Sequence, residues 1–177
     1  MRKWSKLKKD LEERLADSLK DRVQYHITHY GSGDSYTNSR GWITLDGQEV
    51  INASTTKFLT KYYRVAHEVR VINNTLDYRD AIQRAGYYDA YEQAERVAHQ
   101  DGHFSMADFI LACETYVSLS IDEARSSQNM LIRAFSMFDR RLGKRQLAKV
   151  ERADFEHQLV RKFYQIRCEA EGLRPLI

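Results

Sequence analysis

Four cationic side chains are crowded into one short segment near the C-terminal end of the sequence. The segment reads Asp139-Arg140-Arg141-Leu142-Gly143-Lys144-Arg145. A helical pattern leads into Gly143 and another leaves it, and glycine in a left-handed conformation commonly ends a helix. Arg140 and Arg141 would then lie in the last turn of one helix, where the helix dipole favours cations. Lys144 and Arg145 would open the next helix, where the dipole disfavours them.

Cations held against a helix dipole favour a bound anion, which would accept hydrogen bonds from free backbone N–H groups and from the side chains. Lys149 extends the same surface by about one turn. The predicted anion-binding residues are Arg140, Arg141, Lys144, Arg145 and Lys149. We expect a non-enzymatic binding protein whose partner is nucleic acid or a phosphate group. The alternative is neutralisation within the chain, by Asp139, Glu151 or carboxylates of the middle segment.

A second group of polar residues falls on adjacent predicted strands. The group consists of His26, Arg40, Asp46 and Glu49. A histidine beside an arginine and carboxylates can bind or protonate a small ligand, so the alternative function is an enzyme or small-ligand protein. Its pocket would lie between the polar face of the sheet and the loop 31–39. Cross-strand charge pairing explains the same residues. The sequence contains neither a nucleophile elbow nor a phosphate-cradling glycine loop, so catalysis stays open but is not favoured.

The residues that could bind a metal form a weaker pattern than the two groups above. Glu92, Glu95, His99 and His103 recur at three- and four-residue steps. Gly102 is expected to end the helix before His103, and matching Glu-x-x-His copies on other helices are missing. A solvated acidic face accounts for the spacing, so we predict no metal and no cofactor.

The elements that must position these residues begin with an amphipathic helix whose apolar residues run from Trp4 to Leu19. A two-residue period then predicts three strands, which start at Val23, cover 40–45 and cover 48–53. Asp46-Gly47 between the last two is a strong hairpin signal. The product is a three-stranded antiparallel meander.

Everything after Thr55 has a helical pattern. One helix should end at 73–75, a short one should cover 78–85 and stop at Gly86, and the next should end at Asp101-Gly102. Ser105 and Ser120 both open capping-box patterns. Asp154 would cap a helix in the final stretch. We predict a single α+β domain over 1–177: an N-terminal helix and meander in 1–54, then five or six packed helices in 55–177.

Composition limits the function classes. The 177 residues carry a net charge of only +3, yet residues 131–177 hold 11 Lys/Arg against 6 Asp/Glu. The middle segment is acidic, so surfaces of opposite sign in a homo-oligomer are a further possibility. No apolar run of 18 residues and no secretory signal is present, so no membrane partner is expected. Cys113 and Cys168 are distant in sequence, which indicates free thiols in a reducing cytoplasm.

Three stretches together carry a resemblance to a known family. They are Arg40-Gly41-Trp42-Ile43-Thr44-Leu45-Asp46-Gly47, the segment 139–145, and Phe163-Tyr164-Gln165-Ile166-Arg167-Cys168-Glu169-Ala170-Glu171-Gly172-Leu173. With them the sequence resembles, from Lys3 to about Leu173, a family of small bacterial proteins of unknown function. The resemblance implies a bacterial, cytoplasmic protein and carries no activity with it.

Overall fold

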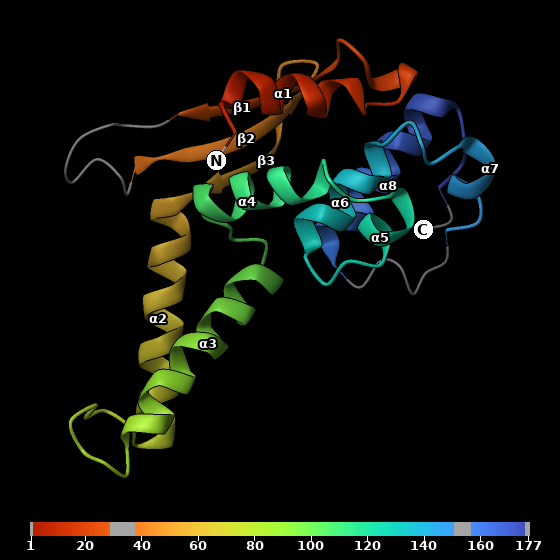
Figure 1. Cartoon of the computed structure of the whole chain (residues 1–177). Helices are drawn as coiled ribbons and strands as arrows, with labels where there is room; N and C mark the ends of the chain where they lie inside the picture. Colours follow the sequence, from red (N-terminus) through yellow and green to blue (C-terminus); the bar gives the residue numbers. More distant parts are fainter. Residues whose placement is uncertain (1, 29–37, 151–156, 176–177) are drawn as a thin grey trace. The chain divides into compact units, whose positions relative to one another are not determined.

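The computed structural model describes residues 2–28, 38–150 and 157–175, which form the predicted α+β fold (Figure 1). The chain begins with helix α1 (Trp4–Glu13) and a 3-10 turn η1 (Asp17–Leu19). Three strands follow: β1 (Val23–Thr28), β2 (Arg40–Leu45) and β3 (Gln48–Ser54). The remaining helices are α2 (Thr55–Asn73), α3 (Arg84–Gln100), α4 (Met106–Tyr116), α5 (Ile121–Arg125), α6 (Met130–Phe138), α7 (Lys144–Leu147) and α8 (Gln158–Glu171). Within the described ranges, none of these helices is long and apolar enough to cross a membrane.

The chain divides into two compact units, each assembled from separate stretches of sequence. The first consists of Met1–Ile27, Gly41–Asn52 and Ala107–Ile177, and it holds α1, most of the sheet, and nearly all of α4 together with the later helices. The second consists of Thr28–Arg40 and Ala53–Met106, and it holds α2 and α3. The predicted basic segment therefore belongs to the first unit.

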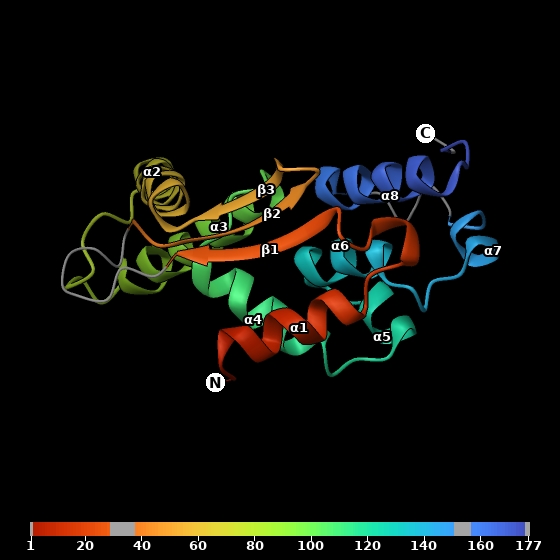
Figure 2. The same ribbon diagram turned by 90° about the horizontal axis from the view of Figure 1, so that it is seen from above.

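The sheet has the strand order β1-β2-β3 (Figure 2). Asp46 and Gly47 join β2 to β3 with φ angles of 51° and 80°. Positive φ at both central residues is typical of a type I′ turn, and the hairpin that the sequence predicted is confirmed. Tyr25 and Ile43 point into the core of the first unit, where both are almost fully buried. There the ring of Phe135 forms T-shaped contacts with the rings of Tyr25 and Phe109. The ring centroids are 6.2 Å and 6.0 Å apart, respectively.

Helices α6 and α8 form the other half of this core (Figure 2). All residues of α6 from Leu131 to Phe138 except Arg133 are buried, because α6 is apolar on nearly every face. Phe138 stacks on Phe163 of α8 with ring centroids 4.3 Å apart. The end of α6 is thus fixed rigidly, and the basic segment starts at the next residue.

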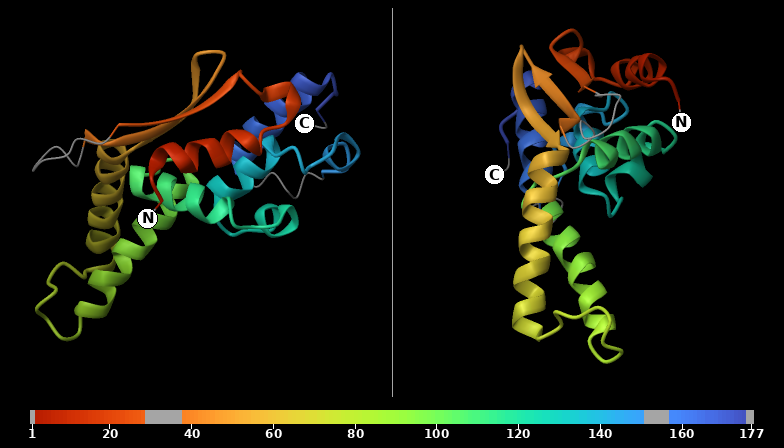
Figure 3. Two further views of the ribbon diagram at one scale, coloured as in Figure 1. Left: turned by 45° about the horizontal axis from the view of Figure 1, so that its top comes forward. Right: turned by 90° about the vertical axis from the view of Figure 1, so that its left-hand side faces the viewer.

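In the second unit, α2 and α3 pack side by side as an antiparallel hairpin (Figure 3). The buried residues of α3 are Ala90, Ala94 and Ala98, at four-residue steps on one face. Such small side chains let two helices approach closely, so this unit has only a small core. An aromatic cluster supplements it: the guanidinium of Arg70 lies 4.6 Å and 4.9 Å from the ring centroids of Tyr87 and Tyr91.

Several helix boundaries match the sequence expectations. Helix α2 covers Thr55–Asn73 and ends at Asn74, whose φ of 52° is left-handed. Gly102, with φ of 79°, follows the end of α3. Ser120 and Glu123 form the reciprocal capping box at the start of α5. Each match depends on a local signal, a cap or a residue that tolerates positive φ.

Other boundaries were wrong. The first helix ends at Glu13, because Leu15 leaves it to form an antiparallel bridge with Asp139. The short helix expected over 78–85 is replaced by turns, and α3 begins at Arg84 and continues through Gly86. A Cβ at Gly86 would lie 2.6 Å from the Thr75 methyl group, so this glycine makes room for the loop and does not end a helix.

The turn at Gly143 also differs from the prediction. Gly143 has φ −68° and caps the start of α7, so it is not left-handed. Helix α6 ends at Phe138, which leaves Arg140 and Arg141 outside it. Seven helices follow the sheet among the described residues, against five or six predicted, because α7 is a separate helix of four residues. The predicted loop 31–39 lies outside the described residues except at its last two positions, and the predicted cap Asp154 lies outside them altogether.

Candidate anion-binding site

Backbone pairing brings the N-terminal segment of the first unit against the basic segment. Leu15 and Asp139 form an antiparallel bridge. The N–H of Ala16 donates to the carbonyl of Phe138 at 2.9 Å, and the N–H of Arg140 donates to the carbonyl of Arg14 at 2.8 Å. Arg14 and Arg140 are therefore brought together although 125 residues separate them in the sequence.

Asp139 is the centre of the segment and is fully buried. Its carboxylate accepts hydrogen bonds from the guanidinium of Arg141, at 2.6 Å from Nη2 and 3.0 Å from Nε, and from the Tyr116 hydroxyl at 2.6 Å. Burial raises the pKa of Asp139, but the bonds from Arg141 and Tyr116 outweigh it, so the pKa lies below its ordinary value. The charge of Arg141 is thus compensated within the chain.

Lys144 is compensated as well. Its ammonium lies 2.9 Å from the carboxylate of Glu171, at the end of α8. Glu171 also pairs with the buried Arg167 and accepts a hydrogen bond from Ser18. Burial raises the pKa of Glu171, but the bonds from Lys144 and Ser18 and the charge of Arg167 lower it further than burial raises it. Neutralisation within the chain, the alternative to anion binding, therefore applies to Arg141 and Lys144.

Arg167 binds the backbone of the basic segment from the protein interior. Its guanidinium donates to the backbone carbonyls of Asp139 at 3.1 Å and of Leu142 at 3.3 Å. The side chain is only 3% exposed, so both carbonyls are held from the protein interior.

The three remaining predicted residues, Arg140, Arg145 and Lys149, are exposed. None of the three forms an ion pair within the described part of the chain, although Glu151, named as a possible partner, lies outside it. Helix α7 has a single turn and little dipole of its own, so it disfavours Lys144 and Arg145 less than the sequence predicted. What distinguishes Arg140 instead is its position at a cavity.

A polar cavity of about 310 Å³ lies where α1 meets the basic segment. It is lined by Asp10, Glu13, Arg14, Val117, Arg140 and Arg141. Its two carboxylates are each in an ion pair: Asp10 with Arg2 at 3.0 Å and Glu13 with Lys9 at 3.8 Å.

Two arginines supply positive charge to the cavity without an ion pair among the described residues. The guanidinium of Arg14 donates to the carbonyls of Val117 and Leu119 and packs over the ring of Tyr116. The exposed Arg140 acts on Asp17 through its charge, which helps to lower the pKa of that carboxyl group. The cavity thus has two guanidinium groups outside ion pairs of the described residues, beside the paired Arg141, and this suits an anion with several acceptor oxygens.

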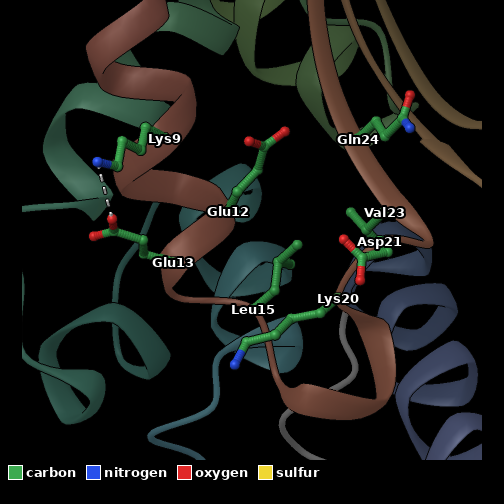
Figure 4. Close-up of a pocket in the computed structure, with 8 residues that line it drawn as sticks. All are labelled: Lys9, Glu12, Glu13, Leu15, Lys20, Asp21, Val23 and Gln24. Atoms are coloured by element: carbon green, nitrogen blue, oxygen red, sulfur yellow. Dashed lines mark ion pairs between the residues drawn. The ribbon is translucent and has the colours of Figure 1, made fainter.

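A second cavity, of about 380 Å³, lies between α1 and the start of β1 (Figure 4). Leu15 and Val23 form its apolar part. Its two lysines are compensated, Lys9 by Glu13 and Lys20 by Asp17. This cavity therefore lacks the free positive charge that marks the first one.

The alternative residues lie on the sheet and in its hairpin turn. His26 stacks on the ring of Trp42 at 5.0 Å and bonds the Thr44 hydroxyl through Nε2 at 3.1 Å. Asp46, in the hairpin turn, accepts two hydrogen bonds from Arg22 at 3.0 and 2.7 Å. Glu49 accepts a hydrogen bond from Asn52 at 2.8 Å. Arg40 is the first residue of β2 and is half-buried. Neither cavity described above is lined by any of these four.

The possible metal ligands lie in the second unit. Glu92 and Glu95 are exposed on α3, and His99 stacks on Phe104 with ring centroids 5.1 Å apart. His103 lies beyond the end of α3 at Asp101-Gly102, as the sequence predicted.

Sequence reasoning missed Arg14. It follows directly after the first helix in an ordinary mixed-charge stretch, and both backbone carbonyls that accept from its guanidinium are more than 100 residues away in sequence. A single sequence carries no signal for such a pairing.

By its fold and its cavity, the chain is an α+β protein with an arginine-lined cavity between the N-terminal helix and the turn after α6. The chain belongs to the SF0329 protein family, an uncharacterised family whose model matches residues 3–168. No curated protein and no solved structure matches the chain. The expectation of an uncharacterised family is confirmed.

Proposed function

We propose that this protein is a non-enzymatic binding protein of the bacterial cytoplasm that holds a phosphate group of its partner at the arginine-lined cavity. The observation that carries the proposal is that two guanidinium groups, those of Arg14 and Arg140, line one cavity of about 310 Å³ and form no ion pair with any described residue. Arginine is the side chain whose planar fork matches phosphate oxygens. Arg145 and Lys149 would extend the contact along a phosphate backbone, and the buried free thiols of Cys113 and Cys168 suit a reducing compartment.

The cavity is organised before any anion arrives. Arg14 is oriented by backbone carbonyls, and the chain at Arg140 is fixed by its hydrogen bond to the Arg14 carbonyl. A site whose donors are already placed loses less conformational entropy on binding. Arg140 itself keeps its side chain free to close over the anion.

The test is binding of fluorescein-labelled random single-stranded DNA, duplex DNA and RNA, followed by anisotropy from about 50 to 300 mM KCl. Inorganic phosphate and pyrophosphate are titrated calorimetrically in parallel. For a nucleic-acid partner, log K should fall linearly with log salt, with a slope of about −0.9 for each phosphate neutralised. Binding of the small anions alone would identify a free phosphate compound as the partner.

Matched variants locate the site. Arg140→Ala should weaken binding roughly five- to tenfold and lower the salt slope by about 1. Arg140→Lys keeps the charge but loses the planar fork of the guanidinium group. Its affinity should therefore lie between those of Arg140→Ala and the wild type. Arg96→Ala removes an exposed arginine of α3 as a control for net charge. Equal losses in Arg140→Ala and Arg96→Ala, or no binding of any of these anions, would refute the proposal.

A further inference from the structure

The segment that connects α2 to α3 lies at the end of their hairpin (Figures 1 and 3). Six large apolar side chains in and beside this segment are exposed. We call them the tip surface: Val71, Ile72, Leu76, Tyr78, Ile82 and Tyr88. Ile82 is 91% exposed and Ile72 80%. Side chains of this size, exposed to this degree, present on the order of 600 Å² of apolar surface. That matches the largest patch usual on a monomer and approaches the roughly 800 Å² that each partner buries in a stable interface.

The loop that carries the tip surface is held by its own hydrogen bonds. Asp77 accepts from the N–H of Arg79 at 2.8 Å, and Asp80 accepts from the N–H of Ile82 at 2.7 Å. Gln83 accepts from the N–H of Asp77 at 3.1 Å and so closes the loop on itself. Ile82 is therefore displayed by an ordered turn. A preorganised apolar surface loses less conformational entropy on association than a flexible one.

The charges around the tip surface are equal in number and opposite in sign. Asp77 and Asp80 alternate with Arg79 and Arg84 along the loop. The carboxylates accept from backbone N–H groups, while the guanidinium groups donate to the hydroxyl of Tyr78 and to backbone carbonyls. Among the residues that the structure describes, none of these four side chains is in an ion pair. The rim thus carries two anions and two cations that are outside ion pairs in the described part of the chain.

A surface with this rim is complementary to itself. In a two-fold arrangement each patch meets its own copy, so an aspartate of one copy faces an arginine of the other. A membrane surface fits less well, because anionic lipid attracts a rim with net positive charge. We propose that the tip surface is the interface through which two copies of this chain associate.

Sedimentation equilibrium of the full-length protein over a concentration series tests the proposal. The wild type should be a dimer at the upper end of the series. Ile72→Lys/Ile82→Lys places two like charges on each patch and should raise the dimer dissociation constant by at least tenfold. Both isoleucines are largely exposed, so the fold should survive, and circular dichroism checks this. Leu111→Lys, at a residue of α4 that is 63% exposed in the other unit, is the matched control and should leave the dimer unchanged.

Charge reversal gives an independent readout. Asp80→Arg should weaken the dimer, Arg84→Asp should weaken it too, and an equimolar mixture of the two variants should recover association. A monomeric wild type would overturn the proposal, whether or not the protein binds anionic vesicles through Ile72 and Ile82. A dimer that Leu111→Lys disrupts as strongly as the double lysine variant would overturn it as well.

Discussion

Replacing Asp139 with alanine would remove the buried carboxylate on which the whole basic segment is arranged. Asp139 is fully buried, and its carboxylate holds Arg141 and the hydroxyl of Tyr116. It also accepts a hydrogen bond from the N–H of Arg141 at 2.8 Å. The backbone carbonyl of Asp139 would keep its bond from Arg167 in the variant, because that bond does not involve the side chain.

The expected loss follows from what each partner can do without the carboxylate. Tyr116 is 1% exposed, so its hydroxyl would stay buried without an acceptor, which costs about 1–3 kcal/mol. The side chain of Arg141 is 32% exposed and keeps its bond to the Leu119 carbonyl, so water can restore much of its solvation at a cost of about 1 kcal/mol. Together the free energy of unfolding should fall by about 3 kcal/mol, which corresponds to a drop of about 6–12 °C in Tm for a chain of this size.

Urea unfolding followed by tryptophan fluorescence measures this loss directly, because Trp4 and Trp42 both lie in the unit that contains Asp139. Asp139→Asn keeps an acceptor for Tyr116 and should lose about half as much. Asp17→Ala breaks an exposed pair with Lys20 and should change little. A loss below about 1 kcal/mol for Asp139→Ala would refute the view that this carboxylate is a structural centre.

Three further outcomes are expected. Gly41→Ala should destabilise the first unit by about 1–3 kcal/mol, since its Cβ would overlap the Phe109 ring, whereas Gly143→Ala has open space and should be tolerated; equal urea midpoints would contradict this. Since Asp139 and Glu171 have lowered pKa values when folded, stability should be complete above their unfolded pKa values and decline below about pH 4; a urea midpoint that rises on acidification would disprove it. Burial raises the pKa of both Cys113 and Cys168, so Ellman's reagent should label neither thiol in the native protein and both after unfolding.

Features encoded by neighbouring residues could be predicted from the sequence. The Asp46-Gly47 hairpin, the Ser120 capping box and the end of α2 at Asn74 each depend on a few residues that are close in the chain. The α+β class followed from the change of hydrophobic period from 3.6 to 2 and back. Local rules failed where a distant segment decided the outcome. The first helix stops short because Leu15 pairs with Asp139. Gly86 lies inside α3, at a place where a Cβ would collide with the Thr75 methyl group.

The candidate site shows the same division. The sequence identified the basic segment, and it also offered internal neutralisation as the alternative. Which cations are neutralised depends on residues elsewhere in the chain. Glu171 of α8 neutralises Lys144, and the buried Asp139, which accepts a hydrogen bond from Tyr116, neutralises Arg141. The same long-range arrangement made Arg14 invisible to sequence reasoning, since nothing near it indicates a cavity.

The interleaved order of the two units has a consequence for synthesis on the ribosome. The N–H of Ala16 finds its acceptor only at Phe138, about 120 residues later, which at 5–20 residues per second is a delay of roughly 6–24 seconds. The α2–α3 hairpin, by contrast, comes from one continuous stretch and can form as soon as it emerges. The nascent chain therefore carries a finished hairpin while α1 and the sheet still wait for α6 and α8, and the arginine-lined cavity is among the last features to appear.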